Sequence, residues 1–185
     1  FVDFGLARNG FLHISDVNRQ YFPKGKKGAE PIGRKRSHKD RPPIQDCLRR
    51  GQEVVVQMTK EGIGTKGPTL TTYLSIPGKL LVMMPGMSRL GVSRKIEDEE
   101  ARSAARQLLG DLQVPDDMGM IIRTAGITSN KRELKQDLNY LLRLWKAVDQ
   151  RIKSAKAPCE IYQESDLVTR TIRDVYNTDI HRVIC

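Results

Sequence analysis

The chain opens on two short runs, residues 1–5 and 11–15, in which apolar and polar side chains alternate, separated by a polar segment that ends at Gly10. This pattern predicts two β-strands joined by a tight connection. Because successive side chains of a strand point to opposite faces, one arrangement buries one side of both runs and exposes the other. The buried side would hold Val2, Phe4, Leu12 and Ile14, and the exposed side Phe1, Phe11 and His13.

Exposed aromatic rings on a small basic sheet give the bases of single-stranded nucleic acid a surface on which to stack. The alternative is that Phe1 and Phe11 fill a core, and the alternation alone favours neither. The composition favours the first arrangement, because 32 Lys and Arg against 22 Asp and Glu give a net charge of +10. Such a charge attracts phosphate, although it also fits a ribosomal partner or an anionic membrane surface.

Other features of the composition limit the class of protein. No apolar run approaches the ~20 residues that span a bilayer, and no signal-peptide pattern opens the chain, so no membrane span is expected. The three cysteines, Cys47, Cys159 and Cys185, lie far apart without a Cys-x-x-Cys pair. This spacing argues against a disulfide framework and against a zinc site, and it suits a cytoplasmic protein. The first residue is not Met and already lies in a predicted strand, so we expect an incomplete piece.

A basic insertion is predicted at residues 24–43. Between Lys24 and Arg41 stand eight Lys and Arg but two acidic residues, which gives this segment +6 of the net charge of +10. Its glycines and its near lack of apolar residues predict a mobile loop. Two interpretations stay open: a solvated loop without a target, or one that is attracted to a phosphate backbone.

The residues that follow the insertion, up to about position 76, predict a small β-rich unit. A short helix is expected over residues 44–50, and strands are expected over residues 54–58 and 69–74. The loop between the strands is rich in glycine and carries Lys66. Short strands, glycine turns and a basic loop are typical of a Greek-key barrel such as the OB-fold, which commonly binds single strands.

From Pro77-Gly78, which predicts a domain boundary, strands alternate with helices. Strands are expected over residues 79–84 and 120–122, and helices over residues 98–110 and 130–153. This alternation indicates an α/β layer. The acids at 98–100 are interpreted as helix caps, Asn130 with Glu133 as a capping box, and Trp145 as part of the apolar stripe of the longest helix. After Pro158 short elements follow, with a strand expected over residues 180–184.

Several longer motifs occur in a fixed order along the chain. They are Phe-Val-Asp-Phe-Gly, Asn-Gly-Phe-Leu, Tyr-Phe-Pro, Gly-Gln-Glu-Val, Lys-Gly-Pro-Thr-Leu-Thr-Thr, Met-Gly-Met-Ile-Ile-Arg-Thr-Ala-Gly, Asp-Leu-Asn-Tyr-Leu-Leu-Arg-Leu-Trp and Tyr-Gln-Glu-Ser. Taken together they resemble the bacterial ribonuclease E/G family over essentially all 185 residues. The segment from Met118 to Gly126 is the most specific of them, whereas the first motif alone would indicate only an RNA-binding OB-fold.

The resemblance implies an α+β fold in three parts. Residues 1–76 would form an OB-fold β-barrel without its first strand, residues 77–169 an α/β 5′-sensor domain, and residues 170–185 the truncated start of an RNase H-like domain. It also implies site residues. Single-stranded RNA would be contacted by Phe1, Phe11 and Lys66, and a 5′-monophosphate by Gly78, Val82, Arg123 and Thr124. The chain departs from the best-known family pattern at His13, which is predicted as a further RNA contact because it suits other OB-folds of this type.

The residue types expected at the 5′-monophosphate site suit a phosphate. Arginine presents a planar fork to phosphate oxygens, threonine adds a hydroxyl, and Gly78 permits a close approach of the backbone. Without the resemblance, a surface salt bridge would be the favoured interpretation of Arg123.

The resemblance also implies an activity of the complete protein. The family cuts single-stranded RNA, in RNA processing and mRNA decay, with Mg²⁺ held by two downstream aspartates that lie in Asp-Ile-Asn and Ile-Asp-Phe motifs. Neither motif occurs here, and the cysteines of the family's zinc-link between subunits are missing as well. We therefore expect no catalytic residue and no metal ligand in this chain, which would bind RNA but not cut it. The complete protein would be a cytoplasmic endoribonuclease and a homo-oligomer.

Two other classes of function stay open at this point. One is a non-catalytic RNA-binding or ribosome-associated module that carries the same two domains. The other is a scaffold whose basic loop and long helix bind protein partners.

Overall fold

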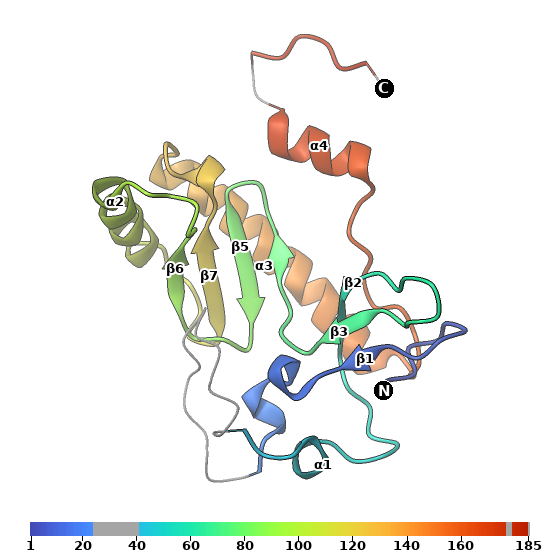
Figure 1. Cartoon of the computed structure of the whole chain (residues 1–185). Helices are drawn as coiled ribbons and strands as arrows, with labels where there is room; N and C mark the ends of the chain where they lie inside the picture. Colours follow the sequence, from blue (N-terminus) through green and yellow to red (C-terminus); the bar gives the residue numbers. More distant parts are fainter. Residues whose placement is uncertain (24–40, 177–178, 185) are drawn as a thin grey trace.

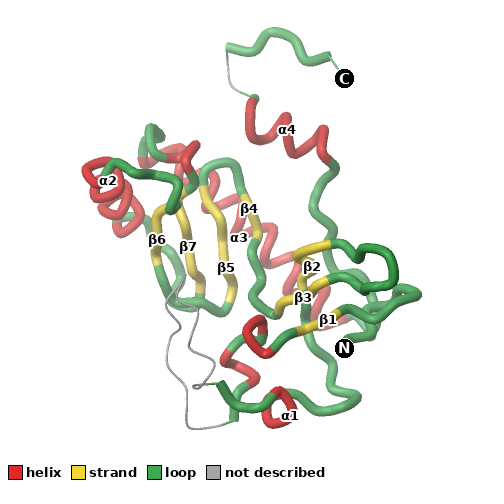
Figure 2. The backbone as a smooth tube through the Cα atoms, viewed as in Figure 1, coloured by secondary structure: helices red, strands yellow, loops and turns green. Residues whose placement is uncertain are grey.

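The computed structural model describes residues 1–23, 41–176 and 179–184. Within these residues the chain forms two small β-sheets and four α-helices (Figures 1 and 2). The predicted mixture of helix and sheet is therefore confirmed. Residues 24–40, the larger part of the predicted basic insertion, lie outside the described residues, so that insertion stays a prediction.

The first sheet has three strands in the order β1-β3-β2. β1 (Phe11–Leu12) runs parallel to β3 (Thr69–Thr71), and β2 (Gln57–Lys60) is antiparallel to β3. The opening run adds a single bridge, in which Val2 and Gly10 exchange two backbone hydrogen bonds of 2.9 Å. Over the described residues these strands form an open sheet, so the OB-fold barrel stays a prediction.

A small core lies beneath this sheet, next to helix α1 (Ile44–Cys47). Its buried residues are Leu12, Val17, Cys47 and Leu70. The strand predicted at residues 54–58 is found at Gln57–Lys60, and Val56, just before it, packs against this core. The strand predicted over residues 11–15 is likewise shorter, since β1 ends at Leu12 and Ile14–Asp16 forms a 3-10 turn.

The second sheet has four strands in the order β4-β5-β7-β6. β5 (Leu81–Pro85) is antiparallel both to β4 (Ile76–Pro77) and to β7 (Met118–Ile122), and β6 (Leu90–Val92) is parallel to β7. Burial alternates along β5, as expected of a strand with one face on a core.

Two helices complete this α/β layer. α2 (Glu99–Gly110) lies beside β6, and α3 (Lys131–Ser154) runs along the back of the sheet (Figure 1). Both predicted N-terminal caps are confirmed: the side chain of Asp98 accepts from two backbone N–H groups of α2, and Asn130 with Glu133 forms a capping box on α3. Trp145 is partly buried and packs against the core of the layer, as predicted. The buried residues of this larger core are Ile76, Leu80, Leu81, Met83, Ala105, Leu109, Leu112, Met118, Met120, Ile122, Leu134, Leu138 and Leu141.

The dipeptide Pro77-Gly78 lies at a hairpin between β4 and β5. Ile76 pairs with Met83 and Pro77 with Val82, so Ile76 joins the second sheet and its core. Proline can stand in β4 because β4 is an edge strand, where a missing N–H costs no ladder bond. The Pro-Gly signal therefore marks a turn inside the second sheet, and the domain boundary predicted there stays a prediction.

Two further elements differ from the prediction. β6 lies between the strand expected over residues 79–84 and the helix expected over residues 98–110, where no strand was predicted. Helix α4 (Leu167–Val175) lies beyond the β4–β5 end of the sheet (Figure 1), and its N-cap Asp166 accepts from the N–H of Thr169. Residues 179–184 form no strand, so the strand expected there is wrong.

None of the helices in the described part of the chain is long and apolar enough to cross a membrane.

Candidate functional site

Phe1, Phe11 and His13 form an exposed aromatic surface on the first sheet. Phe1 is 88% exposed and Phe11 44%, and their ring centroids lie 5.7 Å apart with a tilt of 57°. The Phe11 and His13 rings lie 6.2 Å apart. The opposite sides of the two runs pack on the small core, as predicted for Val2, Phe4, Leu12 and Ile14. The alternative, in which Phe1 and Phe11 fill the core, is therefore wrong.

Hydrogen bonds of the Phe11 backbone and of the His13 side chain position these two residues of the aromatic surface. The N–H of Phe11 donates to the carbonyl of Pro68 over 2.8 Å, at the start of the β1–β3 pairing. His13 caps the 3-10 turn that follows, where its Nδ1 accepts a hydrogen bond of 3.2 Å from the N–H of Ser15. A neutral His13 ring with that acceptor carries its proton on Nε2.

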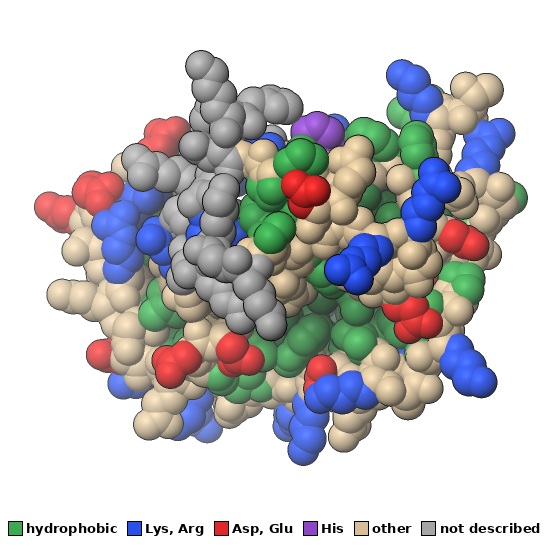
Figure 3. Space-filling view, turned by 90° about the horizontal axis from the view of Figure 1, so that it is seen from below, with side chains coloured by type: hydrophobic (Ala, Val, Ile, Leu, Met, Phe, Trp, Pro, Cys, Tyr) green, Lys and Arg blue, Asp and Glu red, His purple; other side chains and the backbone are tan. Residues whose placement is uncertain are grey.

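Lys66 is exposed on the loop between β2 and β3, and this loop contacts the segment that leads into β1. The Arg8 guanidinium donates to the carbonyl of Gly64. Gly67 packs so closely on Asn9 that an added Cβ would lie 2.1 Å from the Asn9 carbonyl oxygen, which requires glycine there. The structure thus anchors the loop of Lys66 beside the strand of Phe11. Figure 3 shows Lys and Arg side chains spread over one face of the molecule, not gathered into one patch.

The four residues of the predicted phosphate pocket come from the β4–β5 hairpin and the end of β7. Arg123 Nη1 donates to the carbonyls of Gly78 and Lys79, and the Arg123 backbone N–H donates to the Leu80 carbonyl over 2.8 Å. Thr124 follows and is exposed, and the partly buried Val82 lies opposite Pro77 in the hairpin. The structure brings Gly78 and Arg123 into direct contact, with Thr124 next to them.

Asp137 on α3 is a residue of this region that the sequence did not single out. Its carboxylate accepts hydrogen bonds from three successive backbone N–H groups, those of Lys79 (3.1 Å), Leu80 (2.8 Å) and Leu81 (2.8 Å). A Cβ on Gly78 would lie 2.6 Å from one of its oxygens. The close approach that requires glycine at position 78 is therefore that of the Asp137 carboxylate.

Asp174 on α4 binds the fork of Arg123. Its two oxygens accept from Arg123 Nη1 and Nη2 over 3.1 and 2.9 Å, in the bidentate geometry in which arginine also takes two phosphate oxygens. The salt bridge that Arg123 would be assigned without the family resemblance is thus present. Hydrogen bonding from Arg123, and further from Arg173, lowers the pKa of Asp174 to about 2.

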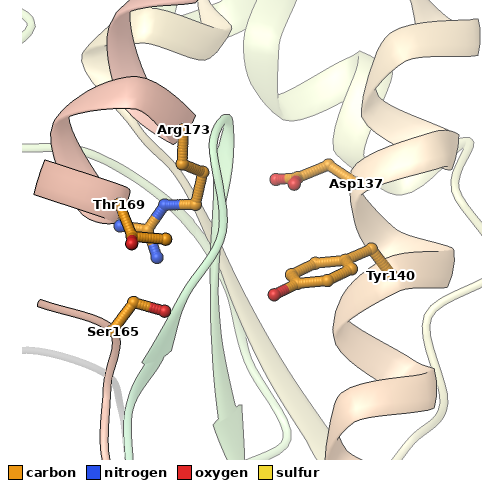
Figure 4. Close-up of a pocket in the computed structure, with 5 residues that line it drawn as sticks. All are labelled: Asp137, Tyr140, Ser165, Thr169 and Arg173. Carbon is orange, nitrogen blue, oxygen red and sulfur yellow. The ribbon is translucent and has the colours of Figure 1, made fainter. Parts of the chain in front are cut away.

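A cavity of about 310 Å³ lies between α3 and α4, lined by Asp137, Tyr140, Ser165, Thr169 and Arg173. In Figure 4 the two residues of α3 face the other three across the gap. Arg173 also donates to the carbonyl of Pro77 over 3.2 Å. This cavity therefore adjoins the hairpin, although the four predicted phosphate-pocket residues do not line it.

No group of three His, Cys, Asp or Glu side chains is placed to hold a metal ion in the part of the chain that the structure describes. Cys47 is buried and Cys159 exposed, and both are free thiols. The magnesium and the downstream aspartates that the family resemblance implies for the complete protein stay predictions.

The ion pair gives a first testable prediction. Because the folded-state pKa of Asp174 is depressed, the pair stabilises the folded chain fully above pH ~4 and is lost as the pH falls through about 2. Arg123→Gln should move this pKa up toward its ordinary value of 3.8. A ¹³C NMR titration of the Asp174 carboxyl measures the shift. Arg170→Gln, which removes a cation paired with Glu164, should leave the Asp174 pKa in place, and an unchanged value in Arg123→Gln would contradict the pairing.

Comparison with known proteins identifies the family of this chain. A model of the ribonuclease E/G family matches residues 75–185. Ribonuclease E of Haemophilus influenzae is 43% identical over all 185 residues, and ribonuclease E of Escherichia coli 40%. Ribonuclease G of Escherichia coli is 35% identical over 183 residues, 99% of this chain. The chain spans only 19%, 16% and 36% of the lengths of these three relatives. The predicted resemblance is confirmed, and the chain belongs to the ribonuclease E/G family.

Proposed function

We propose that this chain is the RNA-binding part of a single-strand-specific endoribonuclease and that it recognises the 5′-monophosphate of its substrate. The fork of Arg123 carries the proposal. Arg123 is followed in the chain by the exposed, hydroxyl-bearing Thr124, and its fork already holds the two oxygens of a carboxylate at 3.1 and 2.9 Å. Two oxygens of a terminal phosphate present similar acceptors to such a fork, with more negative charge.

The aromatic surface supports binding of single-stranded RNA. Base stacking on exposed rings is tolerant of sequence, because every base has a π-face. Lys66, on the loop anchored beside β1, would supply a phosphate contact there. In this proposal residues 1–76 belong to an OB-fold, residues 77–169 to the 5′-sensor domain and residues 170–185 to the start of an RNase H-like domain.

The activity belongs to the complete protein. The relatives are named ribonuclease E and ribonuclease G, and the chain spans a minor part of each. We place the cleavage of RNA, in RNA processing and mRNA decay, in residues outside this chain, where Mg²⁺ would activate water and stabilise the leaving oxygen. This chain by itself would bind RNA without cutting it, and the complete protein would be a homo-oligomer.

The test uses two short single-stranded RNAs that differ only at the 5′ end, which carries a monophosphate or a hydroxyl. The chain should bind the monophosphate form more tightly in fluorescence anisotropy at moderate salt. Arg123→Ala should abolish this preference and leave the affinity for the hydroxyl form unchanged, because the fork would contact only the terminal phosphate. Arg106→Ala, at an exposed arginine paired with Glu99 on α2, is the matched control. An equal loss for both RNAs in Arg123→Ala would make Arg123 a general backbone contact.

A separate prediction tests the aromatic surface. Phe11→Ala should weaken binding of both RNAs by ~1–3 kcal/mol, the range of one base stacked on an aromatic ring. Phe11 is 44% exposed, so the fold should persist, which circular dichroism checks. Tyr162→Ala, at an exposed aromatic side chain outside this surface, should leave the affinity unchanged. Unchanged affinity in a folded Phe11→Ala would remove Phe11 from the interface.

A further inference from the structure

Helix α4 occupies the fork of Arg123 with a carboxylate of this same chain. Arginine has five N–H donors, and Asp174 takes the parallel pair on Nη1 and Nη2, which form one edge of the guanidinium. The remaining contacts of Nη1 go to the carbonyls of Gly78 and Lys79 on the hairpin. A phosphate that used the same edge would have to replace the carboxylate.

We propose that Asp174 is an internal competitor of the 5′-monophosphate, so that docking of α4 and binding of the phosphorylated RNA end at Arg123 exclude one another. This inference rests on the proposed function of Arg123. It assigns to Asp174 a role in specificity, because only a group with more negative charge than one carboxylate displaces it. A 5′-hydroxyl carries no charge and leaves α4 docked.

The contacts of α4 with the rest of the chain suit a helix that can be displaced. Those that lie at the hairpin are polar: Asp174 with Arg123, Arg173 with the Pro77 carbonyl, and Lys79 Nζ with the carbonyl of Tyr176, just after the helix. α4 has no buried residue. Its large apolar side chains are all exposed, by 76%, 50%, 38% and 60% for Leu167, Val168, Ile172 and Val175.

Because its contacts at the hairpin are polar and its apolar side chains are exposed, α4 is held mainly by hydrogen bonds and ion pairs. Burial of apolar side chains is the main source of stability for a docked helix, and α4 contributes none to either core. A partly exposed ion pair stabilises weakly. The side chains of Arg123 and Asp174 are 28% and 33% exposed, so solvent and a competing anion both reach the pair.

Charge favours the phosphate over the carboxylate. A phosphate monoester carries −1.5 to −2 near neutral pH, about twice the charge of Asp174, and has three acceptor oxygens. Undocking of α4 would also free Lys79, whose ammonium group now donates to the carbonyl of Tyr176. Replacement of Asp174 by the phosphate therefore also makes the Lys79 ammonium group available near the Arg123 fork.

Asp174→Asn tests the inference in the binding assay with the two RNAs. The amide removes the charge that holds the fork, so the affinity for the monophosphate form should rise roughly 1.5- to fivefold, the range of an exposed ion pair, with no change for the hydroxyl form. Glu164→Gln is the matched control, because it removes one negative charge that pairs with Arg170 and Arg173 but not with Arg123. Any gain in that variant should be equal for the two RNAs.

The outcomes separate this inference from the proposed function. If the unmodified chain prefers the monophosphate and Asp174→Asn keeps or weakens that preference, Asp174 merely positions Arg123 and the competition is refuted. If neither the unmodified chain nor either variant distinguishes the two RNAs, the sensing function itself fails, and the competition with it.

Hydrogen–deuterium exchange gives a second, independent readout. Saturating monophosphate RNA should speed exchange of the backbone amides of residues 167–175, whereas the hydroxyl RNA should not. Equal or slower exchange with bound monophosphate RNA would show that α4 stays docked, and would overturn the inference.

Discussion

Asp137→Ala should lower the free energy of unfolding by about 3 kcal/mol, less than the sum of three hydrogen bonds to a charged group at ~1.5–3 kcal/mol each, because water takes over part of them. The carboxylate is the acceptor for the N–H groups of Lys79, Leu80 and Leu81. Alanine leaves all three without that partner, and water replaces it only in part. Urea unfolding followed by circular dichroism measures the change through the shift of the midpoint.

Two further variants test whether the loss of stability comes from the Asp137 hydrogen bonds themselves. Asp149→Ala removes another acid of α3, one that pairs with Lys153 at the surface, and should cost less than ~0.5 kcal/mol. Gly78→Ala should be destabilising in the unmodified chain, because its Cβ would lie 2.6 Å from the carboxylate. It should cost much less once Asp137 is alanine, and such coupling is expected only of residues in contact. Additive losses would mean that the two residues act separately.

Leu141→Ala should lower the free energy of unfolding by ~2–5 kcal/mol, the usual cost of a cavity left by leucine in a closely packed core. Leu141 is fully buried on the face of α3 that meets the second sheet. The substitution removes part of the contact that joins the helix to β5. The same unfolding experiment measures it.

Leu90→Ala is the control for this core substitution. Leu90 lies in β6 and is 48% exposed, so its truncation leaves little cavity and should cost below ~1 kcal/mol. Similar losses for Leu90→Ala and Leu141→Ala would contradict the packing of α3 on the sheet.

The parts of the molecule that were predictable from the sequence depend on short-range patterns. Alternation with period two placed Phe1, Phe11 and His13 on one face, and the spacing of Asn130 and Glu133 identified the start of α3. Each signal lies within a few residues of the chain, where backbone geometry alone fixes which side chains share a face. The family resemblance added Arg123 and Gly78, which the structure brings together.

The remaining contacts join segments far apart in the chain and have no local signal. Asp137 lies 56 to 58 residues from the amides that it binds, and Asp174 lies 51 residues from Arg123. On a helix, an isolated aspartate looks the same whether it faces solvent or a distant turn. Pro77-Gly78 is ambiguous for a related reason, since a Pro-Gly pair marks a hairpin as readily as a boundary between domains; the structure shows the hairpin, and the boundary stays a prediction.

The hairpin between β4 and β5 has one further consequence for binding. Its N–H groups point to the carboxylate of Asp137, and its carbonyls at Gly78, Lys79 and Leu80 receive the N–H groups of Arg123. The arginine is thus fixed by the fold, before any RNA arrives. A long, free side chain would give up ~1.5–2 kcal/mol of rotamer entropy on meeting a ligand. Here that loss occurs during folding, so in the proposed function a terminal phosphate would meet an arginine that is already oriented and would have only the Asp174 carboxylate to displace.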